Sequence, residues 1–348
     1  MFMRLVCNVS NYFCLYWEKR EEPDELPYFM GDVIEGNNFS YGFLNKLIHM
    51  PIILSGKIKK RRDKLLVELE QIGDVVEYTN IHFLKSHLQK SIRLKKFSLA
   101  IQTTKHLLDI DPIQLLRRLS IIIIEDAFMN KYYSTLIWLM VAISSNKIKL
   151  QLHHIEFILG LVHLTCQSSH TETYSTPPEI TELSNEKLAK LIDDQSKNIK
   201  NKYQHANIQA LLIRASYGGM TGDTRMLLNA AYVWVERFMG EGGRWEGEYN
   251  VKMRAISGSV LGLRQEDWVV SAIDFHCFPK MLVWLEEEFE IEEGELKHLI
   301  WHFSSKINKR KFYNNDPIYK PTQQEEENWQ KIRKQVYSIG KYAIKNYS

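Results

Sequence analysis

Hydrophobic positions recur at helical spacing along most of this chain, and short polar breaks separate the periodic stretches. In residues 81–167 the apolar positions Phe97, Ile101, Leu107 and Leu108 fall on one helical face. Asp111 and Pro112 interrupt this pattern, and together they form a helix start signal in which Asp caps and Pro occupies the first turn. Gln114 has the spacing to complete a capping box. The pattern predicts consecutive helices.

Two apolar runs test this assignment. The four isoleucines 121–124 favour a strand when taken alone. The strong start signal ten residues earlier favours a fully buried helix instead. Residues 136–143 are apolar on all sides, which is typical of a core helix, and Asn130 is the expected cap of that helix.

Polar, glycine-containing and proline-containing segments divide the chain into four parts. Residues 1–80 form a mixed N-terminal region. Residues 81–167 form a helical domain, and residues 168–184, rich in Ser, Thr and Pro, form a linker. Residues 185–348 form a second helical domain. The predicted fold is therefore mainly α and multi-helical, with a short mixed region at the N-terminus.

Composition is that of an ordinary globular protein. The 348 residues are 45% hydrophobic and 25% charged, with a formal net charge of +3. This charge is too small to indicate nucleic-acid binding by itself. The four cysteines include no CxxC pair, which favours a reducing environment. Without a signal-peptide pattern or an apolar run of bilayer length, we expect an intracellular, soluble protein with no membrane partner.

Recognised catalytic motifs are missing from the sequence. The nearest approach to a P-loop, Gly31–Gly36, is followed by Asn37 and Asn38 where Lys and Ser or Thr are required. Zinc-type Cys/His pairs, HExxH and GxSxG are also absent. We therefore expect a non-catalytic protein without a cofactor or a bound metal, and enzymatic activity stays an alternative.

One stretch carries a more specific pattern. Residues 87–126 read Lys-Ser-x-Arg, an amphipathic helix, Asp-x-Asp-Pro, Arg-Arg-Leu, five residues, and Glu-Asp. The residues that carry the pattern are Lys90, Ser91, Arg93, Ala100, Asp111, Pro112, Leu116, Arg117, Arg118, Leu119, Glu125 and Asp126. This order resembles the helical C-terminal domain of the RarA/MgsA family of replication-associated AAA+ ATPases, which is similar to the collar of clamp loaders.

The resemblance covers about residues 84–165 and does not include an ATPase module. One departure is the segment 127–130, which stands where the family has a glycine-containing turn. The resemblance implies a clamp-loader-collar-like helical module, a homo-oligomer, and replication proteins as partners.

The spacing of the charged residues has a physical meaning of its own. Arg117 and Glu125 are eight residues apart, so they lie near one helix face, and Arg118 and Asp126 repeat that relation. Arginine has a rigid donor fork that suits carboxylates and phosphates. These pairs either brace neighbouring helices or close onto each other, or else the arginines contact phosphate or another subunit.

Two basic runs are candidates for DNA binding. One spans residues 57–64, and the second contains Lys85 and the cations near residues 90–96, with no acid between them. Such runs neutralise phosphates, although a solvated helix face is an equal alternative. The candidate nucleic-acid-binding residues are Lys57, Lys59, Lys60, Arg61, Arg62, Lys90, Arg93, Lys95, Lys96, Arg117 and Arg118.

The segment from Arg214 to Arg225 contains three glycines. Gly219 and Gly222 precede an expected helix near Thr224, and exposed amides there, with both arginines, form a candidate phosphate site. The simpler alternative is a helix–helix turn.

Asp274, His276 and His302 are weak candidates for catalysis. Together they would form an acid–base pair or a metal site, but sequence spacing does not bring them together. A buried histidine bonded to a structural partner is the more common arrangement.

These observations lead to three expectations. The first is a non-catalytic accessory protein of DNA replication, recombination or repair, which binds single-stranded or forked DNA through basic patches. The second is a metal- or phosphate-dependent enzyme acting on nucleic acid, centred on residues 218–223 and on Asp274, His276 and His302. The third is a protein–protein scaffold.

Overall fold

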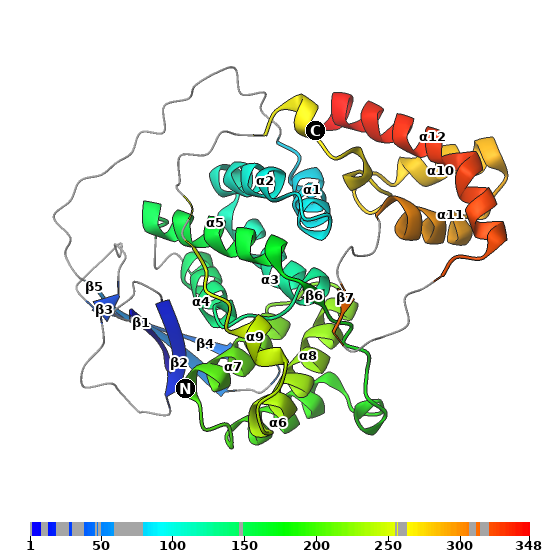
Figure 1. The fold of residues 1–348 in the computed structure, drawn as a ribbon. Helices are drawn as coiled ribbons and strands as arrows, with labels where there is room; N and C mark the ends of the chain where they lie inside the picture. The colour runs from blue at the N-terminus through cyan, green and yellow to red at the C-terminus, as the bar shows by residue number, and fades with distance from the viewer. Residues whose placement is uncertain are drawn as a thin grey trace. The chain divides into compact units, whose positions relative to one another are not determined.

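The computed structural model describes the backbone of strands 2–7, 13–18, 28–29, 38–45 and 50–58, and residues 47, 79–145, 149–254, 256, 263–305, 311–313 and 320–348. Twelve α-helices lie in this part of the chain (Figure 1). The mainly helical fold that the sequence predicts is confirmed.

The mixed N-terminal region forms a five-stranded sheet (Figure 1). Its strands are β1 (Phe2–Cys7), β2 (Phe13–Glu18), β3 (Tyr28–Phe29), β4 (Asn38–Asn45) and β5 (Met50–Ile58). The order is β2-β1-β5-β3, and β4 also pairs with β5. The β1–β2 and β4–β5 pairs are antiparallel, whereas β1 and β3 are parallel to β5.

The chain divides into two compact units that interleave along the sequence. The first contains residues 1–67, 128–158 and 173–252, and the second contains residues 68–127, 159–172 and 253–348. The predicted boundaries at residues 80, 167 and 184 concern domains along the sequence and stay a prediction.

The first unit joins the sheet to helices from three parts of the sequence. Strand β2 lies against α4 and α7. The helices of this unit are α4 (Tyr133–Ser144), α6 (Asn185–Ser196), α7 (Lys202–Ser216), α8 (Thr221–Met239) and α9 (Trp245–Tyr249). A short 3₁₀ turn, η1 (Pro178–Ile180), precedes α6.

Trp234 is the centre of an aromatic core in the first unit. Its ring lies 5.3 Å from Phe128, 5.7 Å from Trp245 and 5.5 Å from Tyr249, measured between centroids. Its indole N–H donates to the hydroxyl of Tyr174 at 3.0 Å. This bond satisfies the polar group of a fully buried tryptophan.

The second unit contains the helices of the candidate site. They are α1 (Ile81–Arg93), α2 (Phe97–Ile110), α3 (Pro112–Asp126), α10 (Lys280–Phe289), α11 (Glu293–Leu299) and α12 (Gln323–Tyr347). Helix α5 (Leu152–Gln167) begins in the first unit and ends in the second. The remaining elements are η2 (Gln265–Asp267), η3 (Val270–Ala272), η4 (Ile300–Ser304), and the parallel pair β6 (His170–Thr171) and β7 (Lys311–Phe312).

The predicted helix start at residue 111 is confirmed. The Asp111 carboxylate accepts a hydrogen bond from the Gln114 backbone N–H at 3.0 Å, and Pro112 is the first residue of α3. The capping box is not completed, because the Gln114 side-chain oxygen instead accepts from Lys85 Nζ at 3.2 Å.

The two apolar runs lie inside helices, as predicted. Residues 121–124 belong to α3 and are at most 1% exposed, and residues 136–143 of α4 are at most 7% exposed. The predicted cap of α4 was wrong in detail. Asn130 accepts from the Tyr132 backbone N–H, one turn before the helix begins at Tyr133.

Candidate functional site

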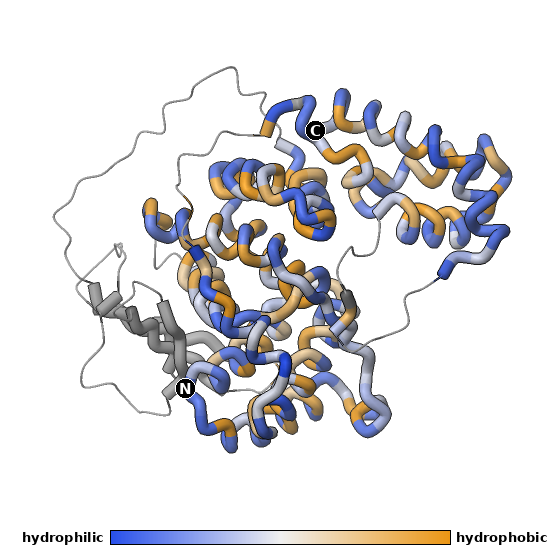
Figure 2. The backbone as a smooth tube through the Cα atoms, viewed as in Figure 1, coloured by the Kyte–Doolittle hydropathy of each residue, from blue (hydrophilic) through white to orange (hydrophobic). Residues whose placement is uncertain are grey.

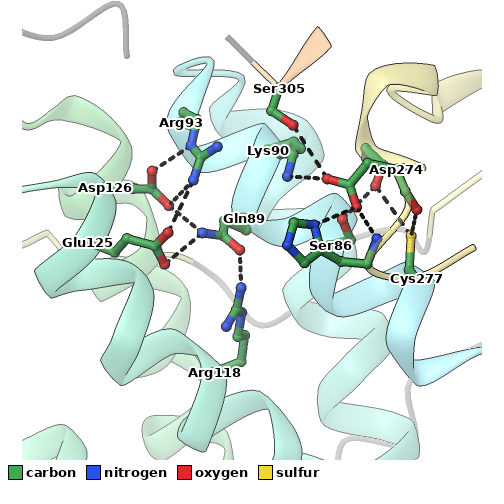
Figure 3. A network of polar contacts seen from close by, with 12 residues as sticks. Ser86, Gln89, Lys90, Arg93, Arg118, Glu125, Asp126, Asp274, Cys277 and Ser305 are labelled. Atoms are coloured by element: carbon green, nitrogen blue, oxygen red, sulfur yellow. Dashed lines mark hydrogen bonds and ion pairs between the residues drawn. The ribbon is translucent and has the colours of Figure 1, made fainter. Parts of the chain in front are cut away.

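Helix α1 positions the site because it buries polar residues together with apolar ones. Asn80 caps its N-terminus by accepting from the backbone N–H groups of His82 and Phe83. Phe83 and three aliphatic residues of α1 are at most 1% exposed, but Lys90 and Arg93 are only 6% and 4% exposed. A buried cation needs an anionic partner. Lys90 and Arg93 each contact a carboxylate of the same unit (Figure 3).

Arg93 binds the two acids that end α3. Its Nε donates to Asp126 Oδ1 at 2.5 Å, and its Nη2 donates to Asp126 Oδ2 at 3.2 Å. The same Nη2 reaches Glu125 Oε1 at 3.5 Å. Because the guanidinium fork matches a carboxylate, this two-point contact fixes the orientation of α1 on α3.

Gln89 completes the connection between α1 and α3. Its amide nitrogen donates to Glu125 Oε2 at 2.9 Å and to Asp126 Oδ2 at 2.8 Å. Its amide oxygen accepts a hydrogen bond from Arg118. Gln89 therefore lies between an arginine and two carboxylates (Figure 3) and uses both ends of its amide.

Lys90 joins α1 to the segment that follows η3. Its Nζ lies 2.8 Å from Asp274 Oδ2, and both side chains are at least nine-tenths buried. His276 donates to Asp274 Oδ1 from its backbone N–H at 3.0 Å, and its Nδ1 lies 3.2 Å from the same atom. Ser305 donates to Oδ2 at 3.4 Å.

Electrostatics keep the Asp274 carboxylate charged. Burial alone would raise its pKa, but the hydrogen bond from His276 and the charge and hydrogen bond of Lys90 outweigh burial. The pKa of Asp274 therefore lies well below its usual range. The Asp274 carboxylate is therefore an ionised group held by hydrogen bonds, and it does not exchange protons near neutral pH.

Cys277 lies beside this pair but is not an activated thiol. Its Sγ donates to the carbonyl oxygen of Asp274 at 3.4 Å. Burial and the negative charge of Asp274 raise its pKa to about 11. A thiolate is the reactive form of cysteine, so this environment disfavours nucleophilic chemistry at Cys277.

Glu125 is the least favourably placed charge of the network. Burial and the adjacent Asp126 carboxylate raise its pKa, and Arg93 and Arg118 only partly offset them. The side chain is 32% exposed, whereas Asp126 is 3% exposed. Asp126 is thus the main partner of Arg93, and Glu125 is the secondary one.

The charged residues at the end of α3 therefore brace neighbouring helices, which was one of the alternatives from the sequence. Asp126 and Glu125 bind Arg93 of α1, and Arg118 binds Gln89 of the same helix. The residues that carry the RarA/MgsA resemblance thus include those that hold α1 on α3. Lys90 and Arg93 are not available to phosphate.

A second group of charged residues on α1 and α3 consists of Lys85, Arg117 and Arg118. The pKa of Lys85 is lowered first by partial burial and then by the positive charges of Arg118 and Arg117, against the opposing charge of Asp111. Lys85 therefore lies within electrostatic range of both arginines. All three are half-buried and retain access to solvent.

The turn between α1 and α2 also presents cations to solvent. Lys95 and Lys96 are exposed, and Lys95 adopts a left-handed backbone conformation with φ of 57°. The next residue, Phe97, is 52% exposed, although its ring edge contacts His163. An exposed ring beside two lysines is a feature of surfaces that bind single-stranded nucleic acid.

The first basic run cannot be placed on this surface. Lys59, Lys60, Arg61 and Arg62 lie outside the described residues, and only the backbone of Lys57 is described, within β5. Their role in DNA binding stays a prediction.

The glycine-rich segment is a turn between α7 and α8. Gly218 and Gly219 have φ of 79° and 142°, which only glycine adopts readily. Helix α8 begins at Thr221, which includes Gly222 in its first turn, and no side chain caps it, so the expected start near Thr224 was wrong. Arg214 donates to Gly218 O, and Arg225 donates to Ile180 O and Leu183 O. Both arginines thus brace the backbone.

The three weak catalytic candidates are only partly brought together. Asp274 and His276 are in contact, whereas the ring of His302 lies 4.3 Å from that of His298. Within the residues that the structure describes, no three His, Cys, Asp or Glu side chains are placed to hold a metal ion.

Sequence reasoning missed Gln89 and Ser305. Gln89 lies four residues before Arg93, and i,i+4 spacing places two residues on one helix face. That spacing was a usable signal. Ser305 meets Asp274 across 31 residues, and no local pattern predicts such a contact.

No protein-family model, curated protein or solved structure matches the chain. In the described part of the chain, no helix combines the length and apolar character needed to cross a bilayer.

Proposed function

We propose that this chain is a non-catalytic accessory protein of DNA replication, recombination or repair that acts inside the cell and binds DNA through cations on α1 and α3. The observation that carries the proposal is the cluster of Lys85, Arg117 and Arg118. Both arginines lower the pKa of Lys85, and a group of cations attracts an anion placed near it. A nucleic-acid backbone offers such anions at regular spacing.

The candidate DNA surface is smaller than the sequence predicts. Lys90 and Arg93 leave the set because they are buried in ion pairs. Lys95, Lys96, Arg117 and Arg118 remain as solvent-accessible cations of the same unit.

The resemblance to the RarA/MgsA collar domain supports the second part of the proposal, which is assembly into a homo-oligomer and contact with replication proteins. Light scattering coupled to gel filtration measures the mass of the assembly directly. A mass of one chain at all concentrations would remove this part of the proposal and leave DNA binding to be judged separately.

The DNA-binding part is tested by titrating fluorescent single-stranded, duplex and forked DNA across a salt series. The Lys85→Gln/Arg117→Gln variant should bind duplex DNA more weakly, and its salt slope should fall by roughly two, since each phosphate contact contributes about 0.9. The matched control is Lys187→Gln/Lys190→Gln, which removes two exposed lysines from α6. Equal slopes for both variants, or no binding by the unaltered protein at low salt, would contradict the proposal.

A further inference from the structure

Helix α12 is amphipathic in an unusual way, because the only charged residues on its polar face after Glu327 are basic. Residues 328–348 contain five cations and no acidic residue, whereas the first turns carry Glu325, Glu326 and Glu327. Figure 2 shows hydrophilic and hydrophobic residues alternating along the whole helix. The helix thus has an apolar face along its length and a change of charge along its polar face.

The apolar face is fully used in packing. Trp329, Ile332, Val336 and Ile339 are at most 7% exposed. Gly340 lies against η3 so closely that an added Cβ would be 2.9 Å from Val270 Cγ1. The opposite face of α12 is therefore fixed toward solvent.

Four lysines follow that solvent face. Lys331, Lys334, Lys341 and Lys345 are separated by three, seven and four residues, and all are exposed. This spacing aligns them in one stripe about 21 Å long, at 1.5 Å per residue. Lys331 donates to Asn328, and in the part of the chain described here no acidic side chain pairs with any of the four.

Tyrosines flank the lysine stripe on both sides. At 100° per residue, Tyr337 and Tyr342 lie on opposite sides of it, and they are 37% and 46% exposed. The Tyr342 ring rests on Trp284 of α10 at 5.7 Å, and Lys280 lies 5.6 Å from the ring of Tyr347.

We propose that this basic, tyrosine-flanked face of the C-terminal half of α12 binds single-stranded nucleic acid. Lysines neutralise the backbone phosphates, and the partly exposed rings stack on unpaired bases, which a duplex does not offer. α10 carries Glu286–Glu288 at its C-terminal end, so the site lies toward Lys341, Lys345 and Lys280. The inference rests on the proposed function and gives it a second surface, specific for single strands.

An acidic membrane is the competing partner for a lysine-rich helix. Interfacial helices insert an exposed apolar face between lipid headgroups. The apolar face of α12 is instead covered by η3 and α10, and only tyrosines accompany the lysines. The observations therefore favour a nucleic acid.

The test measures binding of fluorescent oligothymidine by the full chain across a salt series. Lys280→Gln/Lys341→Gln/Lys345→Gln should lower the salt slope by roughly two, at about 0.7 per contact on a single strand. Tyr342→Leu should weaken binding roughly tenfold without changing the slope. The charge-matched control, Lys187→Gln/Lys190→Gln/Lys200→Gln, should behave like the unaltered protein.

The outcomes separate this inference from the proposed function. Unchanged binding of oligothymidine by this triple lysine variant overturns the inference, while duplex and forked DNA binding still decides the proposed function. Loss of all nucleic-acid binding by the unaltered protein overturns both. If the triple lysine variant lost binding to phosphatidylserine vesicles but bound oligothymidine as the unaltered protein does, the face would be assigned to a membrane and the inference would be wrong. Equal affinity for duplex DNA with no effect of Tyr342→Leu would overturn the single-strand specificity.

Discussion

At the scale of single residues, the two acids that end α3 carry different parts of the same contact. Asp126 is buried and binds Arg93 at two points, whereas Glu125 is partly exposed and has a raised pKa. Their substitutions should therefore have unequal effects, although the two residues are adjacent and both bear a carboxylate.

Asp126→Asn should lower the free energy of unfolding by about 3–5 kcal/mol, because it leaves the Arg93 charge buried without its partner. Glu125→Gln should change the free energy of unfolding by less than about 1 kcal/mol at neutral pH, because it removes an ill-placed charge and keeps an acceptor. Urea unfolding of both variants measures the difference. Equal losses would show that the carboxylates share the contact evenly.

Glu125 also predicts a pH dependence. The pKa of Glu125 is higher in the folded than in the unfolded state. At a pH between these two pKa values, the carboxyl group is protonated in the folded protein and ionised in the unfolded chain. Stability therefore falls as pH rises through that window. This contribution should disappear from urea-unfolding curves in Glu125→Gln.

His87 has the opposite pH dependence. Its Nε2 accepts from the Val269 backbone N–H at 2.9 Å, so the proton of the neutral ring is on Nδ1, which faces Thr103 Oγ1 at 2.7 Å. The Thr103 hydroxyl donates onward to Leu99 O. A charged ring would lose its acceptor role toward Val269 inside the core.

Burial and the charge of Lys96 lower the pKa of His87 to about 3. The unfolded chain takes up this proton near pH 6.5, so stability is complete above that pH and declines as pH falls toward 3. Between pH 7 and 4.5 the loss should be about 2–3 kcal/mol. His87→Gln should lose less over the same range, and parallel pH dependences of the two proteins would contradict the assignment.

At the scale of elements, close backbone approach determines how α12 docks. Gly340 approaches η3 so closely that Gly340→Ala must displace Val270 or the helix. Gly294, in α11, has no neighbour within 4 Å of an added Cβ, so alanine there should be neutral or stabilising by up to about 1 kcal/mol.

We therefore expect Gly340→Ala to lower the melting temperature and Gly294→Ala to leave it unchanged or raise it. Differential scanning calorimetry on the two variants makes the comparison. If both raised the melting temperature, helix propensity would dominate over packing, and the docking of α12 on η3 would be looser than described.

Elements also show what sequence patterns predict well. The cap at Asp111 and the helical assignment of residues 121–124 depend on local rules, and both are confirmed. The start of α8 and the cap of α4 were wrong by a few residues because both helices begin without a side-chain cap, so the nearby polar residues do not mark where they start. Lys90 is a different case. Its burial against Asp274, 184 residues away, depends on tertiary packing that no local pattern contains.

At the scale of the whole molecule, the cations that the structure describes on α1, α3 and α12 fall into a buried group and a solvent-accessible group. Lys90 and Arg93 neutralise buried carboxylates and hold α1 in place. Lys85 and Arg117 remain accessible to solvent, as do the lysines along α12. A net charge of +3 conceals this division, because buried and solvent-accessible cations contribute equally to the sum.

The measurement that tests this division most directly is the salt slope of duplex DNA binding by Lys90→Met/Asp274→Leu. The double substitution replaces a buried ion pair with apolar residues, which is often neutral for stability, and it leaves the net charge unchanged. The account predicts the same DNA affinity and the same salt slope as the unaltered protein, with a cooperative urea transition as evidence of folding. A folded variant with a slope reduced by about one, as for a lost phosphate contact, would contradict the account by placing Lys90 among the residues that bind DNA.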